Sequence, residues 1–380
     1  MKLNATYIKI RDKWWGLPLF LPSLILPIFA HINTFAHISS GEVFLFYLPL
    51  ALMISMMMFF SWAALPGIAL GIFVRKYAEL GFYETLSLTA NFIIIIILCW
   101  GGYRVFTPRR NNVSHGDSRL ISQRLFWQIV FPATLFLILF QFAAFVGLLA
   151  SRENLVGVMP FNLGTLINYQ ALLVGNLIGV PLCYFIIRVV RNPFYLRSYY
   201  SQLKQQVDAK VTKKEFAIWL LALGALLLLL CMPLNEKSTI FSTNYTLSLL
   251  LPLMMWGAMR YGYKLISLLW AVVLMISIHS YQNYIPIYPG YTTQLTITSS
   301  SYLVFSFIVN YMAVLATRQR AVVRRIQRLA YVDPVVHLPN VRALNRALRD
   351  APWSALCYLR IPGMEMLVKN YGIMLRIQYK

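Results

Sequence analysis

Few residues of this chain have the type and the spacing that chemistry requires. His31, His37 and His279 fall near the ends of apolar stretches, where an imidazole could bind haem or a metal ion. Their spacing does not single out such a site, and Glu42 likewise falls at the end of an apolar stretch. We therefore assign no catalytic residue and no metal ligand, and the cofactor-binding residues stay unknown.

The apolar stretches have no acidic residue near their middle. Ionisable side chains inside a membrane usually mark the path of an ion or a substrate, and a transporter coupled to protons or sodium ions normally needs one. This pattern argues against transport.

The last fifty residues read as the start of a soluble α/β domain. Asn340 is a suitable N-cap for a helix over 341–350. Residues 354–361 predict a buried strand, and 364–371 predict a second helix. We interpret Asp333 and Asn340 as structural caps rather than as ligands.

The composition requires a membrane around most of the chain. Of its 380 residues, 59% are hydrophobic and 12% are charged, whereas soluble domains have roughly a quarter charged. A spanning helix needs about twenty apolar residues, and fewer where neighbouring helices shield its ends. The sequence therefore predicts an all-α polytopic membrane helix bundle of about ten transmembrane helices, with a tight hairpin near Ser61. The predicted spans are 14–34, 43–59, 61–75, 86–103, 125–149, 165–187, 216–232, 245–259, 265–280 and 300–317.

The basic residues set the predicted orientation. With a cytoplasmic N-terminus, thirty of the 34 lysines and arginines fall on the inner side and four on the outer side. This bias matches the positive-inside rule, so the net charge of +22 indicates a bilayer rather than nucleic acid as the partner. We therefore expect a multi-pass membrane protein with both termini in the cytoplasm.

Residues 318–330 predict a basic linker helix. Val322, Ile326 and Leu329 share one face of it, and the arginines lie off that stripe. Two compatible interpretations remain open. The helix could lie against anionic lipid head groups, or it could continue the last span and pair with its copy in a homodimer.

Residues 331–380 resemble the opening of a GGDEF domain, the diguanylate-cyclase fold. The matching residues are Asp333, Leu338, Pro339 and Asn340. Arg360 stands where the family has its first metal carboxylate, and Val368 where it has an asparagine that contacts guanine. A cation cannot bind Mg²⁺, so the resemblance implies a degenerate domain that neither binds GTP productively nor makes cyclic-di-GMP. Because fifty residues are too few for a stable domain, we expect it to be cut short.

Residues 1–317 resemble MASE1, a membrane sensory domain of bacterial signalling proteins. The resemblance rests on residues 47–51, on 62–66 with Gly71, and on 168–181. It implies a sensory membrane domain over 1–317 that responds to an unknown ligand, the linker over 318–330 and a GGDEF-like fragment over 331–380. It also implies that the membrane is the bacterial inner (plasma) membrane.

The combination resembles enteric-type cyclic-di-GMP phosphodiesterases, in which MASE1 and a degenerate GGDEF domain precede a catalytic EAL domain. The resemblance implies that a longer parent protein hydrolyses cyclic-di-GMP to pGpG with Mg²⁺ or Mn²⁺ in the EAL domain, which these 380 residues do not include. Two other functions stay open, namely a transporter or channel, and a membrane scaffold that localises a partner.

Overall fold

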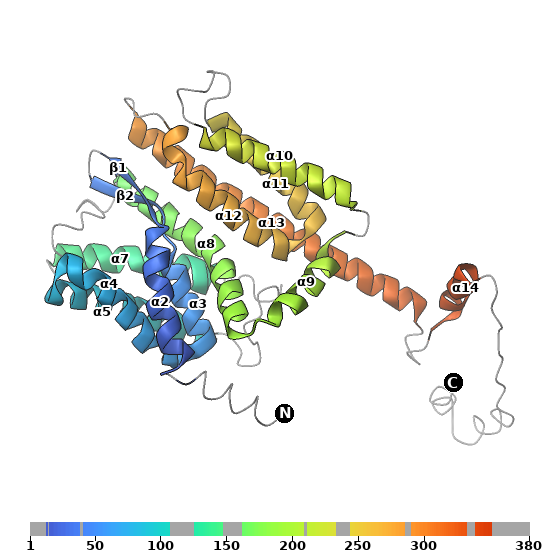
Figure 1. The fold of residues 1–380 in the computed structure, drawn as a ribbon, viewed down its shortest axis with the longest axis horizontal. Helices are drawn as coiled ribbons and strands as arrows, with labels where there is room; N and C mark the ends of the chain where they lie inside the picture. The colour runs from blue at the N-terminus through green and yellow to red at the C-terminus, as the bar shows by residue number, and fades with distance from the viewer. Residues whose placement is uncertain are drawn as a thin grey trace. The chain divides into compact units, whose positions relative to one another are not determined.

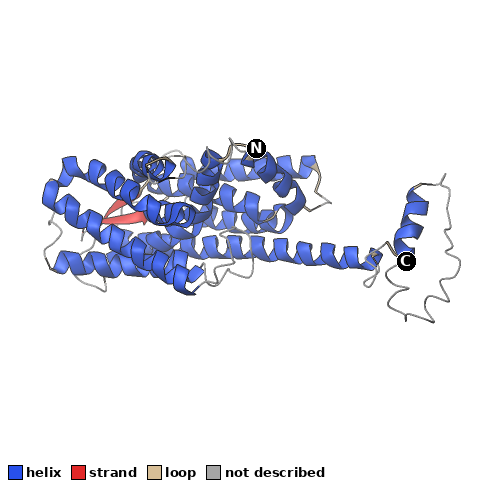
Figure 2. Ribbon diagram, turned by 90° about the horizontal axis from the view of Figure 1, so that it is seen from below, coloured by secondary structure: helices blue, strands red, loops and turns tan. Residues whose placement is uncertain are grey.

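The computed structural model describes residues 13, 15–38, 41–106, 125–146, 162–208, 211–232, 244–285, 290–332 and 339–351. The chain divides into two compact units, Met1–Ala316 and Thr317–Lys380. The described elements are mostly helices, and Figure 2 shows the two strands in red among them. In chain order up to the last long helix they are α2 (Leu17–His31), β1 (Thr34–Ile38), β2 (Gly41–Phe46), α3 (Pro49–Phe60), η1 (Ser61–Ala64), α4 (Leu65–Leu80), α5 (Phe82–Phe106), η3 (Leu125–Val130), α7 (Phe131–Phe145), α8 (Leu163–Arg191), α9 (Tyr195–Gln206), α10 (Lys213–Cys231), α11 (Asn244–Tyr261), α12 (Tyr263–His279) and η5 (Tyr281–Asn283).

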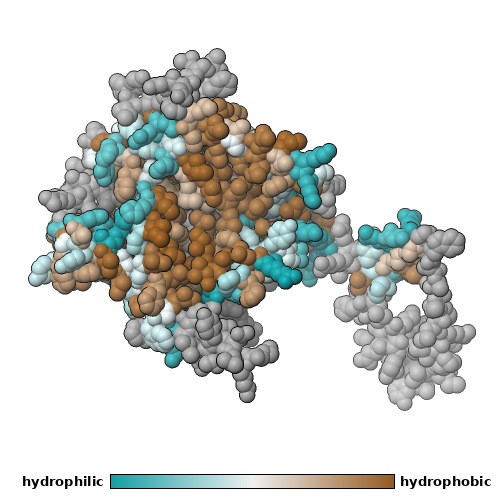
Figure 3. Space-filling model, viewed as in Figure 1, coloured by the Kyte–Doolittle hydropathy of each residue, from teal (hydrophilic) through white to brown (hydrophobic). Residues whose placement is uncertain are grey.

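Every predicted span contains a helix, and the described part of the chain has six stretches that are long and apolar enough to cross a membrane. They are Pro49–Leu80, Phe82–Phe106, Leu125–Ala143, Leu163–Arg191, Lys213–Cys231 and Tyr291–Ile326. Two shorter apolar helices are α2 and α12. Brown apolar side chains dominate the face of the first unit in Figure 3, as lipid contact requires. The count of ten spans stays a prediction.

The stretch Pro49–Leu80 reverses direction at Ser61. The N–H of Leu48, just before α3, donates to Oδ1 of Asn33 (3.1 Å), just after α2, so α3 starts where α2 ends. Gly67, near the start of α4, packs against Pro18 at the start of α2, and a Cβ on it would lie 2.4 Å from the Pro18 carbonyl oxygen. Therefore α3 runs antiparallel to α2 and α4 runs parallel to it. Ser61, with φ at +52°, ends α3, which confirms the predicted hairpin.

The prediction of a helical span over 43–59 was wrong at its start. Residues up to Phe46 form β2, which pairs antiparallel with β1 so that His37 lies opposite Glu42. The helix begins only at Pro49, whose fixed φ suits a first helical turn. Most of β2 is buried on both faces, so its sequence has none of the polar alternation that separates a strand from a spanning helix.

Helix α8 holds the hairpin in place. It contacts β2, α3 and α7 on one side and α12 on the other. Figure 1 shows it between the N-terminal helices and the group α10–α13. The buried side chain of Asn168 accepts the N–H of Phe44 through Oδ1 at 2.6 Å. A Cβ on Gly175 would lie 2.0 Å from the carbonyl oxygen of Tyr47. One polar side chain and one glycine therefore let the strand approach the helix closely.

We expect Asn168→Leu to lower the free energy of unfolding by about 2 kcal/mol, because the buried N–H of Phe44 loses its acceptor. Unfolding in mixed micelles, followed by circular dichroism, measures the change. Leu166→Ala, on the exposed side of the same helix, is the control and should change stability much less. Equal stability of Asn168→Leu and the unchanged chain would contradict this role.

Helix α13 (Tyr291–Tyr331) is longer than the predicted span over 300–317. It continues without interruption through 318–330, as expected of a linker helix that extends the last span. Its membrane part bonds to two other helices. The Trp270 indole N–H of α12 donates to Ser306 (3.0 Å), and the Gln170 amide of α8 donates to Ser300 (2.7 Å).

In the second unit, the predicted helix over 341–350 is present as α14 (Val341–Asp350). Its predicted N-cap is confirmed, because Oδ1 of Asn340 accepts the N–H groups of Arg342 (3.0 Å) and Ala343 (3.1 Å). Asp333, the strand over 354–361 and the helix over 364–371, with Arg360 and Val368, lie outside the described residues.

Candidate ligand-binding cavity

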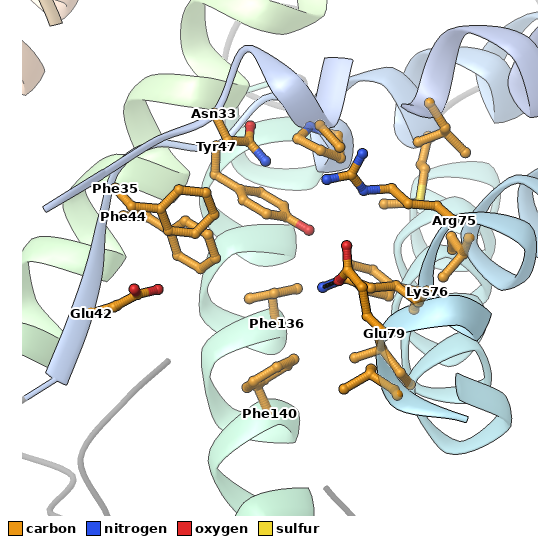
Figure 4. Close-up of a pocket in the computed structure, with 18 of the residues that line it drawn as sticks. Asn33, Phe35, Glu42, Phe44, Tyr47, Arg75, Lys76, Glu79, Phe136 and Phe140 are labelled. Atoms are coloured by element: carbon orange, nitrogen blue, oxygen red, sulfur yellow. Dashed lines mark hydrogen bonds and ion pairs between the residues drawn. The ribbon is translucent and has the colours of Figure 1, made fainter. Parts of the chain in front are cut away.

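A cavity of about 560 Å³ opens where α2 ends and α3 begins. The β1–β2 hairpin, the start of α3, the end of α4 and parts of α2, α5 and α7 line it. Figure 4 shows aromatic rings on one side and charged side chains of α4 on the facing side.

The aromatic wall consists of Phe35, Phe44, Tyr47, Phe136 and Phe140. Its rings contact one another in sequence, with centroids 4.9 Å apart for the first pair, then 4.8, 5.5 and 5.2 Å. Such offset and tilted contacts favour a fixed arrangement of the rings. The hairpin and α7 thus present one continuous apolar surface to the cavity.

The charged wall consists of Arg75, Lys76 and Glu79, all on the last turns of α4. Lys76 and Glu79 form an ion pair at 2.8 Å. The guanidinium of Arg75 donates to the carbonyl of Pro27 (3.3 Å). Because α4 runs parallel to α2, these three charges reach the same end of the bundle as the hairpin.

The predicted candidate residues divide between the cavity and the surface. His37 and Glu42 line the cavity, and they contact each other at 3.3 Å with side chains 80% and 53% exposed. His31 and His279 are exposed residues outside its lining. Within the described residues there is no group of three or more side chains that could hold a metal ion.

A comparison with protein families identifies the membrane part. The family model for MASE1 matches residues 15–320. The chain belongs to the MASE1 family. MASE1 is a membrane domain, so the cavity belongs to a membrane protein, as the composition predicted.

Two curated relatives match almost the whole chain. It is 99% identical over all 380 residues to the protein named cyclic di-GMP phosphodiesterase PdeF of Escherichia coli K12, of which the match covers 51%. It is 25% identical over 375 residues, 96% of this chain, to the probable cyclic di-GMP phosphodiesterase PdeA of the same organism, of which the match covers 50%. The chain thus spans about half the length of these relatives. No solved structure matches it significantly.

The charged wall of the MASE1 domain was not predicted from the sequence. The third predicted span ended at residue 75, whereas α4 continues to Leu80 and includes Lys76 and Glu79. The missed signal was the helical spacing of Arg75, Lys76 and Glu79, which puts the three charges on neighbouring positions of one helix. The aromatic wall carried no such signal, because phenylalanines in apolar stretches are expected anywhere in a membrane bundle.

The hairpin also contacts the segment between α12 and α13. The Tyr281 hydroxyl of η5 donates to the carbonyl of Phe35 (3.2 Å). In the same segment, the hydroxyl of Tyr284 donates to the Ser277 carbonyl (2.7 Å), and burial raises the pKa of Tyr284 to about 12. Phe35 is therefore both a cavity residue and a contact of the segment that links α12 to α13.

Proposed function

We propose that the MASE1 domain is the membrane sensory and anchoring region of a bacterial cyclic-di-GMP signalling protein. The longer protein would hydrolyse cyclic-di-GMP to pGpG in a C-terminal EAL domain with Mg²⁺ or Mn²⁺. The observation that carries this proposal is the 99% identity to a protein named cyclic di-GMP phosphodiesterase PdeF. The GGDEF-like segment would connect sensor and output without turning over GTP.

The contacts of the hairpin support a route for the signal. β2 is fixed to α8 by Asn168, β1 is bonded to η5 through Phe35, and α8 and α12 bond to α13. A ligand that favours one of two arrangements of the hairpin would therefore bias α13, which continues past the membrane.

The same proposal includes the location and the assembly. The domain would lie in the inner membrane and cross it ten times, with both termini in the cytoplasm. The distribution of lysine and arginine supports this orientation. Homodimerisation through α13 would be favoured by Val322, Val323 and Ile326, which are exposed on its basic extension.

Cyclic-di-GMP hydrolysis by isolated membranes tests the function. We expect membranes that carry this chain to be inactive, and membranes that carry a version extended to the full length of the PdeF relative to produce pGpG. Inactivity of both would reject the phosphodiesterase assignment and favour a scaffold or a transporter. Activity of the 380-residue chain would reveal a catalytic site within it.

A further inference from the structure

We propose that the cavity between the hairpin and α4 binds a small organic anion, namely a carboxylate carried on an aromatic or branched apolar body. This inference rests on the proposed sensory function and specifies the chemical class of its input. Three properties carry it, namely the guanidinium of Arg75, the apolar wall and the position of the opening.

One cation of the lining, Arg75, forms no direct ion pair with a carboxylate among the described residues. Glu79 is paired with Lys76 (2.8 Å), and Glu42 contacts His37 (3.3 Å). Arg75 donates to a backbone carbonyl, and its attraction to Glu79, one turn along α4, acts without a direct ion pair because Lys76 holds that carboxylate. Its guanidinium has five N–H donors in a planar fork that suits a carboxylate, and among the described residues it uses one of its nitrogens in the bond to Pro27.

The facing wall determines the body of the ligand. Figure 4 places Tyr47 and Phe136 across the cavity from the α4 charges. Their ring centroids lie 5.5 Å apart, and Phe44 and Phe140 extend the same surface. A volume of about 560 Å³ lies within the usual range of small-molecule sites, which are mostly apolar with a few convergent polar groups. A small hydrophilic anion such as phosphate would leave this wall unused.

The opening lies at the end of the bundle where α2 and α4 finish and the hairpin begins. The side chains of His37 and Glu42 are largely exposed there, and Phe35 is 41% exposed. With the orientation proposed above, this end faces the side of the inner membrane away from the cytoplasm. The ligand would therefore enter from the water on that side, and its contacts with Phe35 and Phe44 would act on the hairpin.

Direct binding to the purified 380-residue chain in lipid nanodiscs tests the proposal. Calorimetric titrations compare phenylacetate with 2-phenylethanol, which has the body without the charge, and with acetate, which has the charge without the body. We expect saturable binding of phenylacetate at least tenfold tighter than that of the other two. Arg75→Gln should weaken phenylacetate binding about tenfold, the usual effect of a lost charge-assisted hydrogen bond. Lys214→Gln, an exposed cation at the start of α10, should leave it unchanged.

Three results would overturn the proposal, namely no saturable binding of phenylacetate, equal binding of 2-phenylethanol, or unchanged affinity in Arg75→Gln. If that variant does not fold, the comparison of the three compounds on the unchanged chain still decides. The assay involves no cyclic-di-GMP. Failure of binding is therefore distinct from failure of the phosphodiesterase assignment, which rests on hydrolysis by the longer protein.

Discussion

Replacing Gly175 with alanine is expected to destabilise the membrane unit by about 3 kcal/mol, at the upper end of the usual cost of overpacking. The added Cβ would lie 2.0 Å from the carbonyl oxygen of Tyr47, and no side-chain rotation can move a backbone atom away. Either β2 and α3 separate from α8 or the helix shifts. Because Tyr47 is part of the aromatic wall, the variant should also weaken the binding of phenylacetate. Unfolding in mixed micelles and the nanodisc titration measure the two effects.

Gly224→Ala is the matched control. Gly224 lies on α10, and a Cβ there would have no atom within 4 Å apart from the adjoining backbone of its own helix. Alanine favours a helix over glycine by up to about 1 kcal/mol, so this variant should be neutral or slightly more stable. If the two variants had the same stability, the close approach of β2 to α8 would not be a feature of the folded protein.

The helices of the membrane unit could be predicted from the sequence because lipid imposes a strong rule. Every backbone N–H and carbonyl must be satisfied within the segment, so an apolar run of sufficient length becomes a helix. The reversal at Ser61 was predicted on the length of the apolar stretch alone. The same rule explains why a helix was wrongly predicted at β2. A strand that pairs inside a helix bundle has residues as apolar as those of a spanning helix. In β1 buried and exposed residues alternate over Thr34–His37, but Thr34 is buried and Phe35 is exposed, so the residue types of this strand give no alternating pattern either.

The candidate site could not be predicted, because its parts come from distant segments. The charged wall belongs to α4, and the aromatic wall joins the hairpin to α7. What brings them together is the parallel course of α2 and α4 and the attachment of β2 to α8 through Asn168. Neither a parallel helix pair nor a buried asparagine that accepts a strand N–H has a recognisable local pattern. The histidines attracted notice by residue type, yet of the three candidates only His37 lines the cavity.

Replacing Trp270 with alanine is expected to destabilise the membrane unit by about 4 kcal/mol. Trp270 is fully buried, and its indole N–H donates to Ser306, so it joins α12 to α13 by both packing and a hydrogen bond. Lipid chains are as apolar as the indole, so the cost comes from the cavity and from lost packing contacts rather than from exposure to water. Unfolding in mixed micelles, followed by circular dichroism, measures the change.

Two further variants separate these contributions. Trp270→Phe keeps most of the ring but leaves the Ser306 hydroxyl without its donor, so it should cost about 1–2 kcal/mol. Trp62→Ala removes a tryptophan that is 54% exposed and should change stability little. If Trp270→Ala were no less stable than Trp62→Ala, α12 would not hold α13 in place. The route from the hairpin to α13 would then depend on the bond between Gln170 and Ser300 and on the contact between the hydroxyls of Tyr284 and Tyr302.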